Sequence, residues 1–323
     1  MLAAELSRTS ETAQLATLCK ALGDPLRLDI MRLLQRDSYG VLELCEIFDI
    51  QQPSMSHHLK VLAKAELVTT RREGNTLFYR RSTPVSSAIG RRAELLLKAI
   101  DDCELPAQYH ARLEKLQTQR SEQSRLFFQE NAERFRQQQD LIASFRDYGS
   151  TIEDLLESRV GSGDVCIEVG AGEGDLLPHL ADQFERVVAV DVSTSMLERA
   201  KEKTAGLDLS NIEFILSEPK QLDFESAADL VSCNMVLHHV ASPSSLVGDM
   251  ARLIRPGGYL LITDLCQHDQ DWARTSCGDQ WLGFETDELD HWTSEFNLVP
   301  SSHQYLALRN GFRVQLSLYE SIA

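Results

Sequence analysis

Residues 163–181 read GDVCIEVGAGEGDLLPHLA, an apolar run followed by a glycine-rich turn and an amphipathic segment. The run VCIEV predicts a buried β-strand, and the glycines predict a tight turn whose backbone approaches a ligand closely. Nicotinamide and flavin proteins use a similar loop, but their G-x-G-x-x-G spacing needs a glycine where this chain has Asp175. The pattern here is E-x-G-x-G-x-G, formed by Glu168, Gly170, Gly172 and Gly174.

The chain beyond this loop repeats the alternation of strand and helix. A second predicted strand, ERVVAVDVS (185–193), ends at Asp191, 21 residues after Gly170, where an acid accepts the hydroxyls of a ribose. Further strands are predicted within 211–224, 227–240 and 252–265, with a hairpin over Asn310 and Gly311 within 303–321. This order predicts an α/β, doubly wound, mostly parallel (Rossmann-like) sheet with its ligand at the carboxyl ends of the strands.

Five motifs occur in order: EVGAGEG, VDVSTSML, SEPKQLDF, NMVLHHV and RPGGYLLI. Over roughly 151–323 they resemble the class I S-adenosylmethionine-dependent methyltransferases. The resemblance implies a cofactor, S-adenosylmethionine or S-adenosylhomocysteine, with its methionine end near Glu168, its ribose on Asp191 and its methyl group beside Asn234. Glu218 would take the acidic position near the adenine, where many relatives have Gly-Asp and this chain has Ser-Glu. The implied cofactor-binding residues are Glu168, Gly170, Ala171, Gly172, Gly174, Asp191, Val192, Met196, Glu218 and Asn234.

Activity is left open by these motifs, because methyl transfer proceeds by proximity and in-line orientation and a catalytic base is optional. His238 and His239 lie beyond the fourth predicted strand, where an acceptor would sit, and are the catalytic candidates. Packing or shaping of the pocket is the favoured interpretation of both. The aromatic and acidic segment 268–292 would cover an acceptor pocket or close the site over the cofactor. Cys266 and Cys277 do not reproduce an arsenic methyltransferase pattern.

The N-terminal third predicts a second kind of domain. Helical periodicity covers 11–22 and 24–36, the second helix with Asp24 as its cap and a proline in its first turn. Shorter helices are expected at 41–49 and 54–66, with Ser54 as the cap of the latter, and a basic-tipped hairpin at 67–81. This order predicts an α+β winged helix-turn-helix.

The paired histidines of SMSHHLKVL (54–62) raise the choice between a metal site and a DNA contact. Adjacent side chains on a helix point about 100° apart, and no acid or cysteine stands one turn away on the same face, so chelation is disfavoured. His57 points away from the apolar stripe, whereas His58 lies at its flank as a half-buried packing residue. Within 52–82 there are six basic and two acidic side chains, which suits nucleic acid. The expected DNA-contacting residues are Ser54, Ser56, His57, Lys60, Lys64, Arg71 and Arg72.

The stretches LGDPLRLDIMRLL, QPSMSHHLKVLAKAELV and RREGNTLFY resemble the ArsR family of bacterial winged-helix repressors over about 11–82. The resemblance implies a homodimer that binds double-stranded operator DNA containing an inverted repeat. Arsenic-sensing members carry a pair of cysteines near the start of the helix before the turn, whereas this chain has Cys45 alone. One thiolate cannot supply the usual pair or trio of ligands, so no metal site is expected.

The middle of the chain is predicted to be helical. Residues 84–103 suit a dimerising helix. Residues 107–147 form a charged, glutamine-rich helical segment. Either its aromatic residues pack between helices, or its end covers the neighbouring pocket. The predicted domains are therefore 1–105 (winged helix), 106–150 (connector or lid) and 151–323 (methyltransferase-like).

Composition limits the partners. Of the net charge of −17, residues 151–323 carry −18, which argues against nucleic acid lying along this half. The seven cysteines stand far apart with no CxxC pair, so free, mostly buried thiols are expected. No run of 18 apolar residues and no secretory signal pattern is found, so a cytoplasmic protein without membrane contact is expected.

Together the two halves resemble ArsR-type regulators that carry a methyltransferase-like domain, some of which are implicated in sensing S-adenosylhomocysteine and controlling methionine-cycle genes. The leading hypothesis is a DNA-binding repressor whose C-terminal domain binds S-adenosylhomocysteine or S-adenosylmethionine as effector. The rival is an enzyme that methylates a small metabolite, quinol or metalloid, with a winged helix that regulates its own gene.

Overall fold

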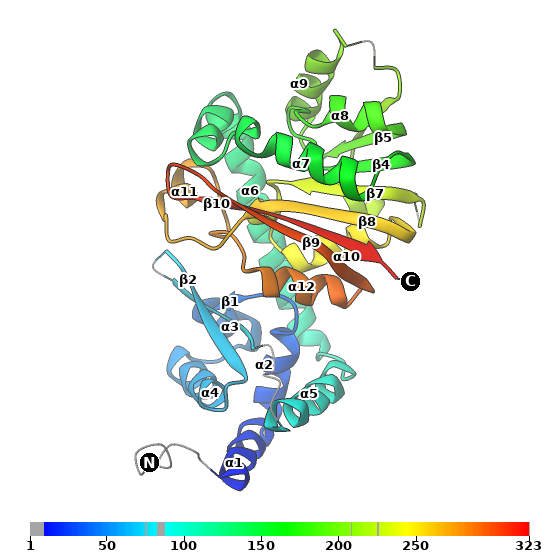
Figure 1. The fold of residues 1–323 in the computed structure, drawn as a ribbon. Helices are drawn as coiled ribbons and strands as arrows, with labels where there is room; N and C mark the ends of the chain where they lie inside the picture. The colour runs from blue at the N-terminus through cyan, green and yellow to red at the C-terminus, as the bar shows by residue number, and fades with distance from the viewer. Residues whose placement is uncertain (1–9, 75, 83–87, 208, 225, 323) are drawn as a thin grey trace. The chain divides into compact units, whose positions relative to one another are not determined.

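The computed structural model describes residues 10–74, 76–82, 88–207, 209–224 and 226–322. The chain divides into two compact units, Met1–Gln119 and Arg120–Ala323 (Figure 1). The finer division into three parts, with boundaries at 105 and 150, stays a prediction.

The first unit is a winged helix-turn-helix, as predicted. Its three strands form one antiparallel sheet in the order β1-β3-β2, in which β2 and β3 make the wing hairpin. Its elements are α1 (Glu11–Leu22), α2 (Pro25–Leu33), β1 (Tyr39–Gly40), α3 (Val41–Phe48), α4 (Gln52–Lys64), β2 (Val68–Glu73), β3 (Thr76–Arg81) and α5 (Ala88–Asp101).

Helix starts in this unit follow local chemistry. The Asp24 carboxylate accepts a hydrogen bond from the Arg27 backbone N–H at 3.1 Å, and Pro25 occupies the first turn of α2, as predicted. The predicted cap of α4 was wrong: α4 begins at Gln52, so Ser54 lies inside its first turn. A proline in the first turn needs no hydrogen-bonded N–H, so Pro53 lets the helix start two residues earlier.

The core of the first unit forms around α4. Met55, Leu59 and Leu62 are fully buried and belong to one apolar cluster with residues of α1, α2, α3 and α5. Between α3 and α4 the chain turns at Asp49, whose φ of 55° lies in the left-handed region. This packing orients the opposite face of α4 towards solvent.

The second unit contains the rest of α6 (Ala107–Ile142), a helix that begins in the first unit. It continues with α7 (Phe145–Arg159), β4 (Gly163–Val169), α8 (Leu177–Gln183), β5 (Phe184–Asp191), α9 (Thr194–Thr204), β6 (Ile212–Leu216), η1 (Pro219–Gln221), β7 (Ala228–Asn234), η2 (Leu237–His239), α10 (Pro243–Ala251), β8 (Ile254–Leu265), α11 (Trp272–Ser276), α12 (Thr286–Ser294), β9 (Leu298–Ala307) and β10 (Arg313–Ser321).

The helical segment predicted for 107–147 is interrupted. α6 ends at Ile142, and α7 starts after Ser144, whose backbone N–H donates to the Asp147 carboxylate at 2.9 Å. This Ser-x-x-Asp pattern stabilises a new helix start. The Asn310 side chain donates to the last carbonyls of α6, those of Leu141 and Ile142, at 2.7 and 2.8 Å.

The sheet of the second unit has seven strands in the order β6-β5-β4-β7-β8-β10-β9 (Figure 1). The pairs from β6 to β8 are parallel, and β10 is antiparallel to both β8 and β9. The predicted α/β methyltransferase-like sheet is therefore confirmed. β9 begins at Leu298, earlier than the predicted 303, because an edge strand tolerates Pro300, which has no N–H for a ladder bond.

Cysteines are distributed unevenly between the units. Cys19 and Cys103 in the first unit are exposed, and Cys45 is half-buried. All four cysteines of the second unit are buried, and burial raises the pKa of each thiol: Cys166, Cys233, Cys266 and Cys277. Among the described residues, no helix has both the length and the apolar character that crossing a membrane requires.

Candidate functional site

The candidate ligand site lies at the carboxyl ends of the central parallel strands. β4 stands between β5 and β7 and is parallel to both, so the three strands end at the same edge of the sheet. Glu168 comes from β4, Asp191 from β5 and Asn234 from β7. This is the edge at which open α/β sheets bind ligands, where the strand order reverses direction.

Hydrogen bonds fix the glycine loop against the end of β5. The N–H groups of Gly170 and Ala171 both donate to the Val190 carbonyl, at 2.8 and 3.1 Å, and the Gly172 N–H donates to the Asp191 carboxylate at 2.9 Å. Gly170, Gly172 and Gly174 have φ of 71°, 53° and 77°, a region that side chains rarely adopt.

The glycines differ in what surrounds them. A Cβ on Gly170 would lie 2.4 Å from a methyl of Val236, and one on Gly174 would press on Leu177 and Ala200. A Cβ on Gly172 would meet nothing closer than 3.9 Å. Gly170 and Gly174 are therefore needed for packing, whereas Gly172 borders open space suited to a ligand that approaches the backbone.

Two buried polar atoms at this edge fit a bound polar ligand. The Asn234 amide donates to one oxygen of Glu168 at 2.7 Å and to the Ser232 hydroxyl at 2.8 Å. The other Glu168 oxygen, Oε2, and Asn234 Oδ1 are buried and accept no hydrogen bond from any residue that the structure describes. Such atoms are costly when left unpaired, and a ligand with N–H or O–H donors would satisfy them.

Asp191 is surrounded by donors and by apolar surface. Its second oxygen accepts the Ser193 N–H at 2.8 Å, and burial raises its pKa against the effect of its backbone hydrogen bonds. The next residue, Val192, is 69% exposed, and Leu216, which pairs with Asp191 across β5 and β6, is 56% exposed. An exposed apolar pair beside a carboxylate suits the face of an aromatic base next to a ribose.

Two implied residues of the pocket are less directly placed for contact. Met196 on α9 is 6% exposed, so it offers little surface to a ligand. Glu218 is exposed beyond the end of β6 and pairs with Lys220 at 2.5 Å. Leu216 was not foreseen, because a leucine at the last position of an apolar strand cannot be distinguished from a core residue by pattern alone.

Glu168 should make the stability of the second unit depend on pH. Burial raises its pKa to about 7, from a usual 4.5, although hydrogen bonds from Ser232 and Asn234 act in the opposite direction. The stabilisation that this shift provides is complete below pH 4.5 and is lost as pH rises through about 7. Glu168→Gln, which mimics the neutral form, should therefore gain about 3 kcal/mol in unfolding free energy over the native chain between these limits.

Denaturant unfolding between pH 5 and 8 measures this difference, followed by tryptophan fluorescence because all three tryptophans lie in the second unit. The control is Glu198→Gln, on the exposed surface of α9. A stability difference for Glu168→Gln that does not change with pH would show that the folded protein keeps this carboxyl at its ordinary pKa.

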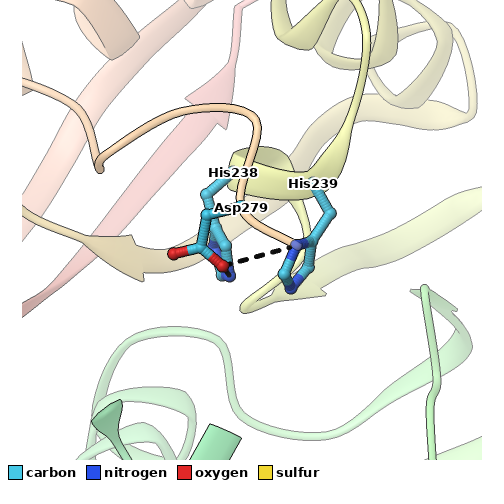
Figure 2. Close-up of side chains that lie close together, drawn as sticks. All are labelled: His238, His239 and Asp279. Carbon is cyan, nitrogen blue, oxygen red and sulfur yellow. Dashed lines mark ion pairs between the residues drawn. The ribbon is translucent and has the colours of Figure 1, made fainter. Parts of the chain in front are cut away.

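The two histidines beyond β7 are buried in a cluster of carboxylates. His238 Nδ1 lies 2.8 Å from Asp264 Oδ1, and its Nε2 lies 3.9 Å from Asp279 Oδ1. His239 Nδ1 lies 3.7 Å from the same Asp279 oxygen, and the centroids of the two imidazole rings are 3.9 Å apart (Figure 2). Both candidate bases thus face protein groups rather than an open acceptor space.

The pKa values of the two histidines move in opposite directions. Burial lowers the pKa of His238, but the carboxylates of Asp264 and Asp279 outweigh it and raise the pKa to about 9. Burial and the neighbouring His238 lower the pKa of His239 well below its usual value. The sequence did not associate Asp264 or Asp279 with this pair, because they come from a different strand and a distant loop.

Tyr148 of α7 is a further residue that sequence analysis missed. Its side chain is buried, and its pKa is raised, first by burial and then by the charges of Asp175 and Glu168. The phenol therefore lies in the electrostatic field of the candidate pocket. A tyrosine in a helix before the first strand has no sequence pattern that marks it as part of a site.

The exposed face of α4 and the wing form the candidate nucleic-acid interface in the first unit. Its members on α4 are Ser54, Ser56, His57, Lys60 and Lys64, and all five are exposed. Arg72 on β2 is also exposed, and its side chain donates to the Gly74 carbonyl at 2.9 Å at the hairpin tip.

Two residues near this face are more enclosed. Arg71 is buried and pairs with the buried Glu73, so it is not part of the exposed surface. His58 is half-buried, with Nδ1 3.9 Å from Asp24, and burial lowers its pKa.

These two units define a winged-helix DNA-binding regulator domain joined to a methyltransferase domain. A family model described as bacterial regulatory protein, arsR family, matches residues 24–70, and a methyltransferase domain model matches 167–262. The arsenical resistance operon repressor of Staphylococcus xylosus is 36% identical over 90 residues, which cover 28% of this chain and 86% of that protein. The chain belongs to the arsR family of bacterial regulatory proteins, and its C-terminal half is a class I methyltransferase domain.

The methyltransferase half has its own relatives. The demethylmenaquinone methyltransferase of Oceanobacillus iheyensis is 28% identical over 131 residues, covering 39% of this chain and 55% of the relative. The chain therefore spans only about half the length of this relative. Among solved structures, a methyltransferase from Bacillus halodurans described as putative shares 16% identity over 54% of this chain and 100% of its own, with a TM-score of 0.47.

Proposed function

We propose that this chain is a transcriptional repressor whose methyltransferase domain binds S-adenosylhomocysteine or S-adenosylmethionine as an effector and changes operator affinity. One observation favours a ligand sensor over an enzyme. The ligand-facing groups Glu168 and Asn234 keep unsatisfied atoms, whereas His238, a candidate base, is fully buried between Asp264 and Asp279. The second unit thus has groups arranged for binding, and its nearest base is enclosed by protein.

The pocket suits an adenosyl ligand in charge and shape. The amino group of its methionine part would donate to Glu168 Oε2, and the ribose hydroxyls would donate to Asp191. Val192 and Leu216 would contact the adenine, and the open space at Gly172 would admit the ligand next to the backbone. An acidic pocket favours a ligand that carries an ammonium group.

The first unit would bind operator DNA through α4. In helix-turn-helix proteins the second helix of the motif lies in the major groove, which here places Ser54, Ser56 and His57 near base edges. Lys60 and Lys64, further along the same exposed face, would contact phosphates, and Arg72 would reach DNA from the wing.

Dimer formation is proposed through α5 and α1. These helices contact each other, yet Leu95 and Leu96 on α5 are 70% and 41% exposed, and Leu15 on α1 is also exposed. Exposed apolar side chains on two adjoining helices suit a protein–protein contact. A second copy of this chain would cover them and would present two α4 helices to an inverted repeat.

Leu95→Glu should convert the dimer to a monomer and weaken operator binding at least tenfold, because a charge would be buried in the dimer contact. Light scattering after size-exclusion chromatography measures the mass, and gel shift measures the affinity. Leu42→Glu is the matched control, since Leu42 on α3 is equally exposed at 70%. A Leu95→Glu chain that stays dimeric would exclude α5 from the interface.

Coupling between ligand and DNA requires that the adenosyl ligand bind the DNA-competent and DNA-incompetent states with different affinity. The test is operator binding by the full-length protein during titration of each adenosyl ligand. A shift of severalfold or more supports a sensor. Unchanged operator affinity, combined with tight ligand binding in calorimetry, would reject it.

An active methyltransferase is the alternative, and one observation favours it. Methyl transfer needs only correct placement of the acceptor, so burial of the histidines does not prevent it. The segment 268–292 leaves Trp272 37% exposed, and an exposed aromatic face would suit a flat acceptor such as a quinol. Formation of S-adenosylhomocysteine in the presence of a defined acceptor would support this alternative.

A further inference from the structure

The strongest unassigned feature of the second unit is the cluster formed by His238, His239 and Asp279 (Figure 2). Each residue offers one ligand atom, and these atoms all lie within 4.8 Å of one another. All three side chains are buried. We propose that this cluster binds one divalent transition-metal ion, with Zn²⁺ as the best match, a site independent of the proposed adenosyl pocket.

The spacing of the cluster is close to what one ion needs. The distances from Asp279 Oδ1 to His238 Nε2 and to His239 Nδ1 are 3.9 and 3.7 Å, too long for hydrogen bonds. His239 Nδ1 also lies 3.4 Å from the Gly278 carbonyl, a long contact that an ion bound at Nδ1 would replace. Two ligands about 2.0–2.1 Å from a tetrahedral ion lie roughly 3.3–3.5 Å apart. The third pair, between the two imidazoles, lies within 4.8 Å, so the side chains would have to close by at most about 1.5 Å to meet on one ion.

Asp264 fixes the orientation of the His238 ring. Its carboxylate lies 2.8 Å from His238 Nδ1 and also accepts the Leu265 N–H, so it is fixed in place. In the neutral imidazole with its proton on Nδ1, Nε2 presents its lone pair towards Asp279, and Nε2 has no hydrogen-bond partner among the residues that the structure describes. Binding of an ion would displace the second proton, from Nε2 to solvent. A carboxylate that orients a metal-binding imidazole in this way is the usual outer shell of a zinc site.

The backbone holds the two ligand-bearing segments together without the ion. The N–H groups of Gln280 and Trp281 both donate to the His238 carbonyl, at 2.8 and 3.1 Å. The Trp281 indole donates to the Val240 carbonyl at 2.7 Å, and the Gln280 amide donates to the His239 carbonyl at 3.1 Å. Asp279 is thus held beside the histidines by its neighbours, which lowers the ordering cost of binding an ion.

The donor set selects the class of metal. Two imidazoles and one carboxylate suit Zn²⁺ and neighbouring transition-metal ions, whereas Mg²⁺ and Ca²⁺ prefer oxygen ligands alone. Three protein ligands leave a fourth position for water or another ligand. The two carboxylates, Asp264 and Asp279, supply the negative charge that a buried dication requires.

The test uses the full-length protein, stripped with a chelator and then titrated with Zn²⁺ against a chromophoric competitor. We expect one tightly bound ion per chain, and titration with Co²⁺ should give the visible absorption of a four-coordinate site. Asp279→Asn and His239→Gln should weaken Zn²⁺ binding more than tenfold, and Asp264→Asn should weaken it by about 10–100-fold.

The matched control is His303→Gln, a histidine 3.3 Å from Asp290 in the same unit but outside the cluster, which should bind Zn²⁺ like the native chain. Circular dichroism checks the fold of each variant. The titration of the native chain tests the proposal even if a variant does not fold. Absence of stoichiometric binding by the native chain would overturn the proposal. So would Asp279→Asn, correctly folded, binding Zn²⁺ as tightly as the native chain.

Discussion

Replacing Asp191 by alanine should weaken binding of S-adenosylhomocysteine at least 100-fold. The proposed ribose contact consists of two hydrogen bonds to a charged group, each worth about 1.5–3 kcal/mol. The same substitution removes the acceptor for the Gly172 and Ser193 N–H groups and so loosens the glycine loop. Isothermal titration calorimetry of the full-length protein measures the dissociation constant.

Asp182→Ala is the matched control, because Asp182 lies on the exposed surface of α8 in the same unit. Asp191→Ala should also retain operator binding in the absence of ligand, since the proposed DNA contacts lie in the first unit, but should lose the ligand response. An Asp191→Ala protein with the native dissociation constant would remove Asp191 from the pocket.

The double substitution Lys60→Ala and Lys64→Ala should weaken operator binding at least tenfold at moderate salt. It should also reduce the slope of log affinity against log salt by about 1.8, since each phosphate contact contributes about 0.9. The physical reason is that both ammonium groups lie on the exposed face of α4 and would neutralise phosphates. Fluorescence anisotropy at several salt concentrations measures both quantities.

Lys115→Ala provides the comparison, because Lys115 is an exposed lysine of the same unit on α6, 3.1 Å from Glu46. The double variant should weaken specific and non-specific DNA alike, whereas His57→Ala should act mainly on the operator. A double variant with the native salt slope would exclude α4 as the phosphate-binding helix.

Much of the fold could be predicted because its signals are local. The motif E-x-G-x-G-x-G needs positive φ at its glycines, and the structure has them at Gly170, Gly172 and Gly174. The apolar spacing of Met55, Leu59 and Leu62 correctly identified the buried face of α4. The doubly wound, mostly parallel sheet was also predicted, since alternating strands and helices allow few topologies.

Of the features that sequence analysis missed, one depends on a contact between distant segments and two on short local patterns. Arg71 looked like a basic wing residue, but its alternation on β2 turns it inward onto Glu73. Asp279 lies 40 residues after His239, in a loop that no periodicity describes. The start of α7 depends on Ser144 and Asp147, a short capping pattern within a long helical composition.

The uneven burial of the thiols has a practical use. A maleimide dye added to the folded protein should attach to Cys19 and Cys103 and leave the four buried cysteines of the second unit unmodified. Cys45 should react slowly, because burial raises its pKa and reduces its thiolate fraction. The chain therefore carries natural attachment points for a fluorophore on its DNA-binding unit and natural tryptophan emitters on the other, so each unit can be observed separately without engineering.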